Sequence, residues 1–285
     1  MLAIFKNILT YALLHLEIFF GKQGIVILEY HRISESISPE DVHSIYPEEF
    51  DFQIEYLVAN GYKIVSLPEV IHLLSNGYNK SEKIIALTFD DGHKDNIHYA
   101  YPILKKFNVK ATMFVLSDYV GKKGWLDEKG NLNIDKVKHG QWWDLLSWDE
   151  LAEIRDHFWI EAHGKSHRQM STLSKHELRE ELLDPMLVIK ETLNIQSTVF
   201  CYPFGNYNNE VVEQTKLLGY AGACSTHKGV NEAYTTDLWK LKRNEVGRGI
   251  TKMQFKLLLN NSIVFYDKVS RFFNRRKTYL NKPTV

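Results

Sequence analysis

The segment KIIALTFDDG, from Lys83 to Gly92, decides how the rest of the sequence is interpreted. Its first seven residues are apolar or β-branched apart from the lysine, which predicts a buried strand over Lys83–Phe89. Asp90 and Asp91 follow directly. Both carboxylates can serve one site only where the strand has ended and the backbone turns at Gly92. Because adjacent anions repel unless a cation or a shared proton holds them, the segment predicts positive charge nearby.

Seven further apolar runs have the length and composition of strands and alternate with helical patterns. They are Ile25–Ile33, Lys63–Leu67, Val109–Leu116, Trp159–His163, Thr198–Tyr202, Ala221–Ser225 and Leu241–Val246. This alternation predicts an α/β fold with a parallel sheet. The most economical arrangement is a closed or nearly closed (β/α) barrel of about seven or eight strands. An open doubly wound sheet is the alternative.

Capping residues mark the helices between these strands. A helix opens at Pro47, and capping-box patterns begin at Ser147 and Ser174. The helix that starts at Ser174 runs to Asn194, and Pro185 is expected to kink or divide it. A further helix spans Asn208–Leu218.

The chain divides into three parts. Residues 1–22 are strongly apolar and predict a helix that lies on a membrane surface or packs on the domain. Residues 23–260 form the core domain. Residues 261–285 are basic with interleaved aromatic residues, which predicts an amphipathic tail that is either solvated or in contact with a membrane. No small-residue cleavage site follows the apolar segment, which argues against a removable signal peptide.

The overall charge argues against a nucleic-acid partner. Lys plus Arg equals Asp plus Glu at 35 each, so no global field attracts polyanions. The sequence contains neither a phosphate-binding glycine loop nor a dinucleotide fingerprint, so no nucleotide cofactor is expected.

Residues suited to a catalytic site lie at the carboxyl ends of four of the predicted strands. In a barrel the carboxyl ends of the strands share one rim, where enzymes keep their sites. One aspartate and two histidines are a common ligand set for a divalent metal, and a neighbouring carboxylate is then free to act as a base. A bound ion lowers the pKa of water from about 15.7 toward about 7, and a separate imidazole can protonate a departing amine. The residues are His31, Asp90, Asp91, His163, His167, Pro203 and Gly205.

Three short motifs, in this order, resemble those of the polysaccharide deacetylases, the NodB-homology carbohydrate esterases. They are TFDDG at 88–92, HGKSH at 163–167 and YPFG at 202–205. The resemblance covers about Ile25–Val246 and implies the distorted TIM-like barrel of that family. It also implies that Asp90 is the base and that Asp91, His163 and His167 bind the metal. The metal it implies is most often Zn²⁺, with Co²⁺, Ni²⁺ or Mn²⁺ as alternatives.

The N-terminal part of the core refines this resemblance. ILEYHRIS at 27–34, together with the pattern PEEFDFQIEYLVANGYKIVSL at 47–67, is similar to the branch that contains the poly-N-acetylglucosamine deacetylases, in which the barrel is circularly permuted. By that similarity His31 is the general acid, and Tyr202 offers its backbone N–H to the oxyanion.

Two positions depart from the family pattern. Many members have an arginine two residues before the motif proline, where this chain has Cys201. We hypothesise that Arg243 takes its place. The residue after the first motif histidine is often Ser or Thr, and here it is Gly164, so a backbone hydrogen bond from that hydroxyl is absent.

Three further residues are candidates for contact with substrate. His93 follows the Asp–Asp–Gly turn, and the aromatic faces of Trp142 and Trp143 suit a pyranose ring, although such residues also pack long loops. Together these features predict a bacterial hydrolase, cytoplasmic or membrane-associated, that removes N-acetyl groups from a polysaccharide and releases acetate. An O-acetyl esterase and a glycan-binding protein with an inactive site are the alternatives.

Overall fold

A computed structural model describes residues 24–37, 41–123, 125–126, 132–133, 144–260, 262 and 264 of the protein. The predicted helix over residues 1–22 lies outside the described residues, as do Trp142 and Trp143 and nearly all of the basic tail. Within the described part of the chain, no helix is long and apolar enough to cross a membrane.

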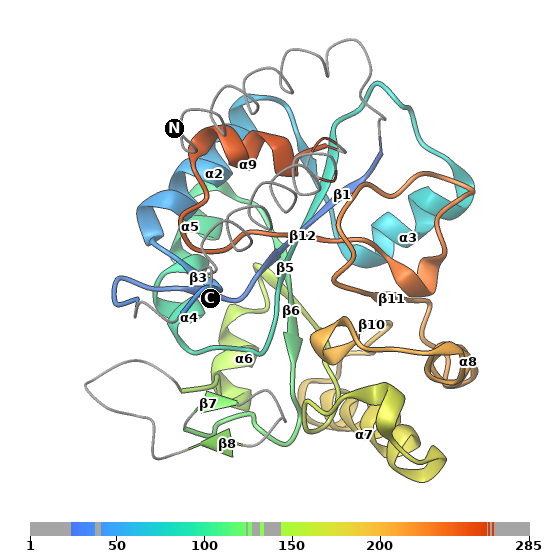
Figure 1. The fold of residues 1–285 in the computed structure, drawn as a ribbon. Coiled ribbons are helices and arrows are strands. Elements are labelled where there is room, and N and C mark those ends of the chain that lie inside the picture. The colour runs from blue at the N-terminus through green and yellow to red at the C-terminus, as the bar shows by residue number, and fades with distance from the viewer. Residues whose placement is uncertain are drawn as a thin grey trace, which may run out of the picture.

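One curled sheet of eight strands forms the centre of the molecule (Figure 1). Seven of the strands lie in the order β11-β10-β9-β6-β5-β1-β12. The eighth strand, β4, pairs with β5. All of these neighbouring strands are parallel. Each of the eight predicted segments contains one of these strands or overlaps it. The strands are β1 (Val26–Tyr30), β4 (Lys63–Ile64), β5 (Ile84–Phe89), β6 (Ala111–Val115), β9 (Phe158–Ala162), β10 (Val199–Cys201), β11 (Gly222–Cys224) and β12 (Asn244–Glu245).

The strand order is that of a barrel. Apart from β4, successive strands of the sheet are neighbours, with none of the order reversal of a doubly wound sheet. The two edges also meet, because Leu241, just before β12, bridges in parallel to Cys224 of β11. The Leu241 N–H donates to the Ala223 carbonyl at 2.9 Å, and the Leu241 carbonyl accepts from the Ser225 N–H at 2.9 Å. The predicted nearly closed (β/α) barrel is therefore confirmed.

Helices surround the sheet, and the apolar residues of the strands divide between its two faces. In β1, Val26 and Leu28 belong to one buried cluster while Ile27 belongs to the other, as alternation along a strand requires. The helices are α2 (Pro47–Ala59), α3 (Leu67–Asn76), α4 (Asp95–His98), α5 (Ala100–Phe107), α6 (Trp148–Ile154), α7 (Lys175–Leu193), α8 (Asn209–Leu217) and α9 (Lys252–Leu258).

Short elements complete the described chain. Two small strand pairs lie outside the barrel, one parallel, β2 (Arg32–Ile33) with β3 (Ser44–Ile45), and one antiparallel, β7 (Trp125–Leu126) with β8 (Leu132–Asn133). Three single-turn helices are η1 (Met170–Thr172), η2 (Pro203–Gly205) and η3 (Leu238–Lys240).

One local prediction was wrong, and a second, that Pro185 kinks or divides the helix from Ser174, was wrong as to division, while the kink stays a prediction. The strand expected over Lys63–Leu67 ends at Ile64, because the Ser66 side chain accepts a hydrogen bond from the Glu69 N–H at 3.2 Å and so caps α3, which begins at Leu67. The helix α7 is also not divided at Pro185, which is buried inside it. Packing of that buried face outweighs the one backbone hydrogen bond that proline removes.

The capping box of α7 gives a test of the fold. Ser174 accepts from the Glu177 N–H, and Glu177 accepts from the Ser174 N–H at 2.9 Å. We expect Ser174→Ala to lower the free energy of unfolding by about 1 kcal/mol. Urea unfolding followed by circular dichroism measures this. Lys175→Ala, one residue into the helix, is the control and should change it by less than about 0.5 kcal/mol. Equal stability of Ser174→Ala and the parent would contradict the assigned cap.

Candidate functional site

The structure brings Asp91, His163 and His167 together at the carboxyl ends of β5 and β9. The Oδ1 atom of Asp91 lies 3.4 Å from Nε2 of His163 and 3.5 Å from Nε2 of His167. Two donors on one tetrahedral ion, each at 2.0–2.2 Å, are about 3.3 to 3.6 Å apart, so the spacing suits a divalent cation. Asp91 Oδ1 is also buried and has no hydrogen-bond partner among the described residues. The three side chains therefore fit a metal.

The tautomer of His163 also suits the binding of a metal ion. Its Nδ1 lies 2.9 Å from the carbonyl oxygen of Cys201, which can only accept, so Nδ1 carries the proton. Nε2, which lies 3.4 Å from Asp91 Oδ1, is then the nitrogen left to bind a metal. Orientation of a ligand imidazole by a backbone carbonyl is usual at metal sites.

The backbone at this site is strained. Of the six non-glycine residues with positive φ in the described part of the chain, three lie here: Asp91 (72°), His167 (58°) and Phe204 (58°). Such conformations cost about 1–3 kcal/mol each and persist where the surrounding contacts enforce them. The strained turns at Asp91 and His167 carry two of the three candidate ligands.

Glu181 of α7 holds the turn between the two histidines. One of its carboxylate oxygens accepts from the backbone N–H groups of Lys165 and Ser166, both at 2.9 Å, and the other accepts from the Ser166 hydroxyl. Gly164 has φ 94°, and a Cβ there would lie 3.2 Å from Glu181 Oε2. The Glu181 carboxylate thus fixes the turn that contains Gly164, the position at which many family members have Ser or Thr. Sequence analysis missed Glu181, although an acid beside Leu178 and Leu182 on the buried face of a helix was a usable signal.

Asp90 is paired with Arg243. Its two oxygens lie 2.7 Å from Nη1 and Nη2 of the guanidinium, and both residues are buried. The guanidinium also lies 3.1 Å from Sγ of Cys201. Arg243 therefore contacts both Asp90 and the position at which many family members have their arginine. Burial raises the pKa of Asp90, but Arg243, with His163 second, lowers it to about 2, so the carboxylate is ionised at neutral pH.

His93 is buried beside Asp91. Its Nε2 is 3.4 Å from Oδ2 of Asp91, whereas the two candidate histidine ligands lie near Oδ1. The geometry makes it a neighbour of the ligand carboxylate and does not expose it as the substrate contact that we predicted.

The prediction for the Tyr202 amide was wrong. Its N–H donates to the carbonyl of Cys224 at 3.1 Å, because the pairing of β10 with β11 continues to this residue, and the bond occupies the proton expected at an oxyanion. Pro203 is buried and has no N–H, and Gly205 has φ 62° with Thr226 only 2.1 Å from where a Cβ would lie. Both shape the turn. Phe204 between them is 40% exposed, and its ring lies 4.4 Å from that of His167.

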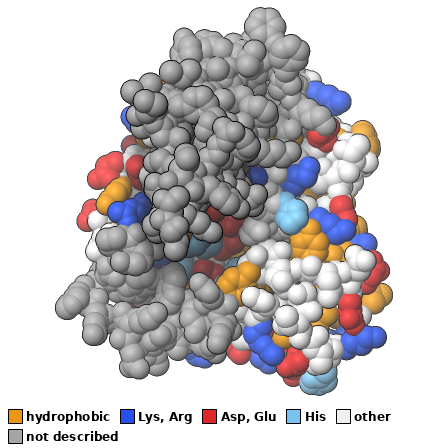
Figure 2. Space-filling model, viewed as in Figure 1, with side chains coloured by type: hydrophobic (Ala, Val, Ile, Leu, Met, Phe, Trp, Pro, Cys, Tyr) orange, Lys and Arg blue, Asp and Glu red, His pale blue; other side chains and the backbone are white. Residues whose placement is uncertain are grey.

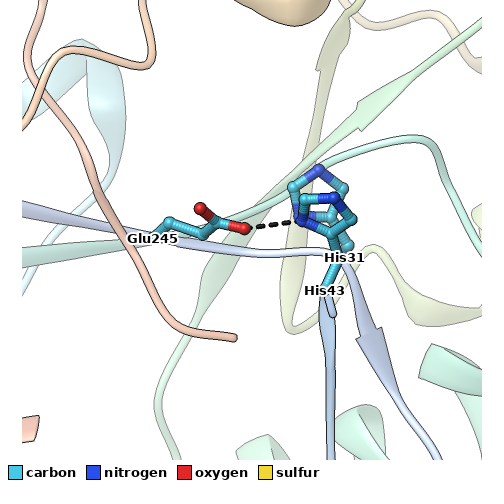
Figure 3. Close-up of side chains that lie close together, drawn as sticks. All are labelled: His31, His43 and Glu245. Atoms are coloured by element: carbon cyan, nitrogen blue, oxygen red, sulfur yellow. Dashed lines mark hydrogen bonds and ion pairs between the residues drawn. The ribbon is translucent and has the colours of Figure 1, made fainter. Parts of the chain in front are cut away.

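His31 follows β1 and adjoins the same site. One of its ring nitrogens lies within 4.8 Å of carboxylate oxygens of Asp90 and Glu29, and its Nδ1 is buried without a hydrogen-bond partner among the described residues. Burial lowers the pKa of His31, while Asp90 and Asp91 oppose that shift. Its ring also lies 4.9 Å from that of His43, a residue that sequence analysis did not select (Figure 3). On the face shown in Figure 2, histidine and acidic side chains are visible in a hollow near the centre.

The fold and these side chains define an α/β enzyme with a candidate divalent-cation site beside a buried carboxylate. A family model described as polysaccharide deacetylase matches residues 77–223, about half of the chain, including Asp90, Asp91, His163 and His167. The chain belongs to the polysaccharide deacetylase family and is a deacetylase. The family acts on acetylated polysaccharides and is generally dependent on a divalent metal, with which the donor set agrees.

Curated relatives agree with this assignment. The chain is 28% identical over 230 residues to a putative polysaccharide deacetylase of Bacillus subtilis, covering 80% of this chain and 74% of that protein. It is 22% identical over 213 residues to the poly-beta-1,6-N-acetyl-D-glucosamine N-deacetylase of Staphylococcus epidermidis, covering 70% and 71%. The Escherichia coli enzyme of the same name is 21% identical over 238 residues, 75% of this chain but only 35% of that protein.

Solved structures share the fold. The Streptococcus pyogenes deacetylase PplD, in complex with acetate, superposes with a TM-score of 0.70 at 24% identity, covering 84% of this chain and 99% of that one. IcaB from Ammonifex degensii superposes with a TM-score of 0.67 at 22% identity, covering 84% and 97%.

The contacts of Glu181 predict a loss of metal affinity. In Glu181→Ala the backbone N–H groups of Lys165 and Ser166 lose their acceptor, so the turn that positions His167 is no longer fixed. We expect binding of Co²⁺ or Zn²⁺ to weaken by about 10- to 100-fold, as for other residues that orient metal ligands. Equilibrium dialysis measures it. The control is Asp184→Ala, since Asp184 contacts only the Lys165 side chain in this turn, at 2.7 Å. Equal affinity of the two variants would contradict the role of Glu181.

Proposed function

We propose that this chain is a metal-dependent N-deacetylase that hydrolyses N-acetyl groups on amino sugars of a bacterial polysaccharide. The observation that carries the proposal is the position of Asp91 Oδ1 between the Nε2 atoms of His163 and His167, with an ionised carboxylate, Asp90, as the next residue. The choice of an amino sugar is supported by the relatives that are named as N-deacetylases of poly-beta-1,6-N-acetyl-D-glucosamine.

Asp91, His163 and His167 would hold the metal. Two imidazoles and one carboxylate favour Zn²⁺, with Co²⁺, Ni²⁺ and Mn²⁺ as alternatives. When bound, a divalent ion polarises the acetyl carbonyl and lowers the pKa of a water molecule.

Asp90 takes the proton from the attacking water. Arg243 donates to both oxygens of Asp90, and the Cys201 thiol donates to Oδ2 at 3.6 Å. The carboxylate is therefore held in one orientation, and a lone pair on Oδ1 can still accept a proton. Its low pKa makes it a weak base that is always in the required ionic form at neutral pH. The water oxygen then forms a bond to the acetyl carbon.

The oxyanion that develops on the acetyl oxygen needs a backbone donor. Because the Tyr202 amide is used within the sheet and Pro203 has none, we assign this role to the amide of Phe204, the next in the segment. Its side chain packs on His167, so the residue adjoins the ligand set. The left-handed φ of Phe204 turns the chain sharply at this point, which suits an amide directed away from the sheet.

His31 donates the proton that lets the amine leave. Cleavage of the carbon–nitrogen bond places negative charge on nitrogen, and an imidazolium beside Asp90 neutralises it as the bond breaks. Burial lowers the pKa of His31, while the carboxylates of Asp90 and Asp91 oppose that shift by favouring the imidazolium form that donates the proton. The products are acetate and the free amino sugar.

Replacement of the two proton-transfer residues tests the proposal. We expect Asp90→Asn and His31→Ala each to reduce acetate release from N-acetylglucosamine oligomers by about 10²- to 10⁴-fold, because each removes one proton transfer. His72→Ala, an exposed histidine on α3, is the control and should keep the parent rate. Full activity of both variants would rule out the assigned roles. Parallel assays on O-acetylated glycans complete the test, since acetate release only from these would favour an esterase.

The ion pair of Asp90 predicts a change in pH dependence. In Arg243→Met, burial of Asp90 is no longer opposed by the guanidinium, so the pKa of the carboxyl rises from about 2. A base is inactive below its pKa, so the acid limb of kcat/KM moves to higher pH, and activity is lost first on the acid side. The matched control is Cys201→Ala, which removes an uncharged neighbour of Asp90 at 3.6 Å and should leave that limb in place. Superimposable profiles of Arg243→Met and the parent would refute this use of Arg243.

A further inference from the structure

A second group of potential metal ligands lies next to the first. His31 after β1, His43 before β3 and Glu245 of β12 each offer a donor atom, and these atoms all lie within 4.8 Å of one another (Figure 3). His43 Nδ1 is 2.6 Å from Glu245 Oε1, and the ring of His43 lies 4.9 Å from that of His31.

Strand pairing builds this group. In the register of β2 with β3, Arg32 pairs with Ser44, so the preceding residues, His31 and His43, are side by side. In the register of β1 with β12, Glu29 pairs with Glu245, which sets Glu245 at the level of the strand end that carries His31. Residues far apart in the sequence are therefore held together by the backbone ladders and not by loop conformation alone.

The donor types and their surroundings suit a transition metal. Two imidazoles and one carboxylate form the same kind of set as Asp91, His163 and His167, and imidazole favours Zn²⁺ over Mg²⁺ or Ca²⁺. The buried Nδ1 of His31 has no hydrogen-bond partner among the described residues, so no protein contact at that atom opposes the binding of an ion by the ring. His43 and Glu245 are 45% and 35% exposed, which leaves a path for an ion from solvent.

We propose that His31, His43 and Glu245 form a second divalent-cation site that takes Zn²⁺ at higher concentrations than the first. It is the weaker site because His43 and Glu245 must exchange their mutual ion pair for the metal and are partly exposed. When filled, it would occupy the imidazole of His31. Binding of the ion does not depend on the proposed function, whereas the resulting inhibition rests on it.

Metal counting tests the site itself. The full chain, stripped with a chelator, is dialysed against increasing Zn²⁺, and bound zinc is measured by mass spectrometry. We expect two classes of site in the parent and loss of the weaker class in His43→Ala and in Glu245→Gln, with the tighter class retained. The matched control is His176→Ala, because His176 faces Glu180 at 3.7 Å on the exposed side of α7 and belongs to no group of three donors in the described chain. It should keep both classes.

Two results would overturn the site. One is a single class in the parent up to millimolar zinc, and the other is a weaker class that persists in both His43→Ala and Glu245→Gln. Far-ultraviolet circular dichroism of each variant shows whether it is folded, and the isosteric Glu245→Gln keeps the test valid if His43→Ala is not.

Activity in the same zinc series tests the consequence. Since a general acid contributes about 10²- to 10⁴-fold, zinc that fills the weaker class should slow acetate release by the parent about 100-fold, and His43→Ala should show no such loss relative to its own rate at low zinc. Filling of the weaker class without loss of rate would refute the involvement of His31. A chain that releases acetate from no glycan at low zinc would instead count against the proposed function, while the metal counts would still decide the second site.

Discussion

The buried ion pair between Asp90 and Arg243 is the interaction on which the site depends. It joins the end of β5 to the start of β12, and both partners are withdrawn from water. Removal of one member of such a pair typically costs about 3–5 kcal/mol, because the other charge is left buried alone. The pair also explains how Asp90 and Asp91 can be adjacent although their negative charges repel each other. The protein supplies a cation to Asp90, and it leaves one oxygen of Asp91 between two imidazole nitrogens with no proton donor of its own.

The two carboxylates thus differ in environment although they are adjacent in sequence. The fold of the turn produces this difference, since the left-handed φ of 72° at Asp91 bends the backbone immediately after the strand. Contacts with neighbouring segments offset the free-energy cost of that backbone conformation. The Gly92 carbonyl accepts from the Leu146 N–H at 2.9 Å, and His93 pairs with Leu145, so the turn is held by backbone hydrogen bonds from the residues before α6. These backbone hydrogen bonds therefore stabilise the strained conformation of Asp91, a candidate metal ligand.

The sequence predicted those parts of the molecule that depend on local pattern. The eight strands were visible as strand-like runs, most of them apolar, and the Asp–Asp–Gly and His-x-x-x-His segments as motifs. Features that depend on pairing between distant segments were not visible. The N–H of Tyr202 was misjudged because its acceptor, Cys224, belongs to another strand. Glu181 was missed because it binds backbone amides in a turn fifteen residues earlier. The contact of Arg243 with Asp90 was no more than a hypothesis, since the two residues are 153 positions apart.

A difference in burial and orientation explains why we expect Asp91, His163 and His167 to bind an ion before His31, His43 and Glu245 do. Asp91, His163 and His167 are largely buried, and His163 is already oriented by the Cys201 carbonyl, so little freedom is lost when an ion binds. His43 and Glu245 are partly exposed and already bonded to each other. An ion there must break that contact and immobilise two side chains, and both effects lower affinity even though the donor atoms are of the same types. Preorganisation, rather than ligand chemistry, then sets the order of filling. His31 belongs to both environments, close to Asp90 on one side and to His43 on the other, so the state of the exposed pair bears directly on the imidazole next to the candidate base.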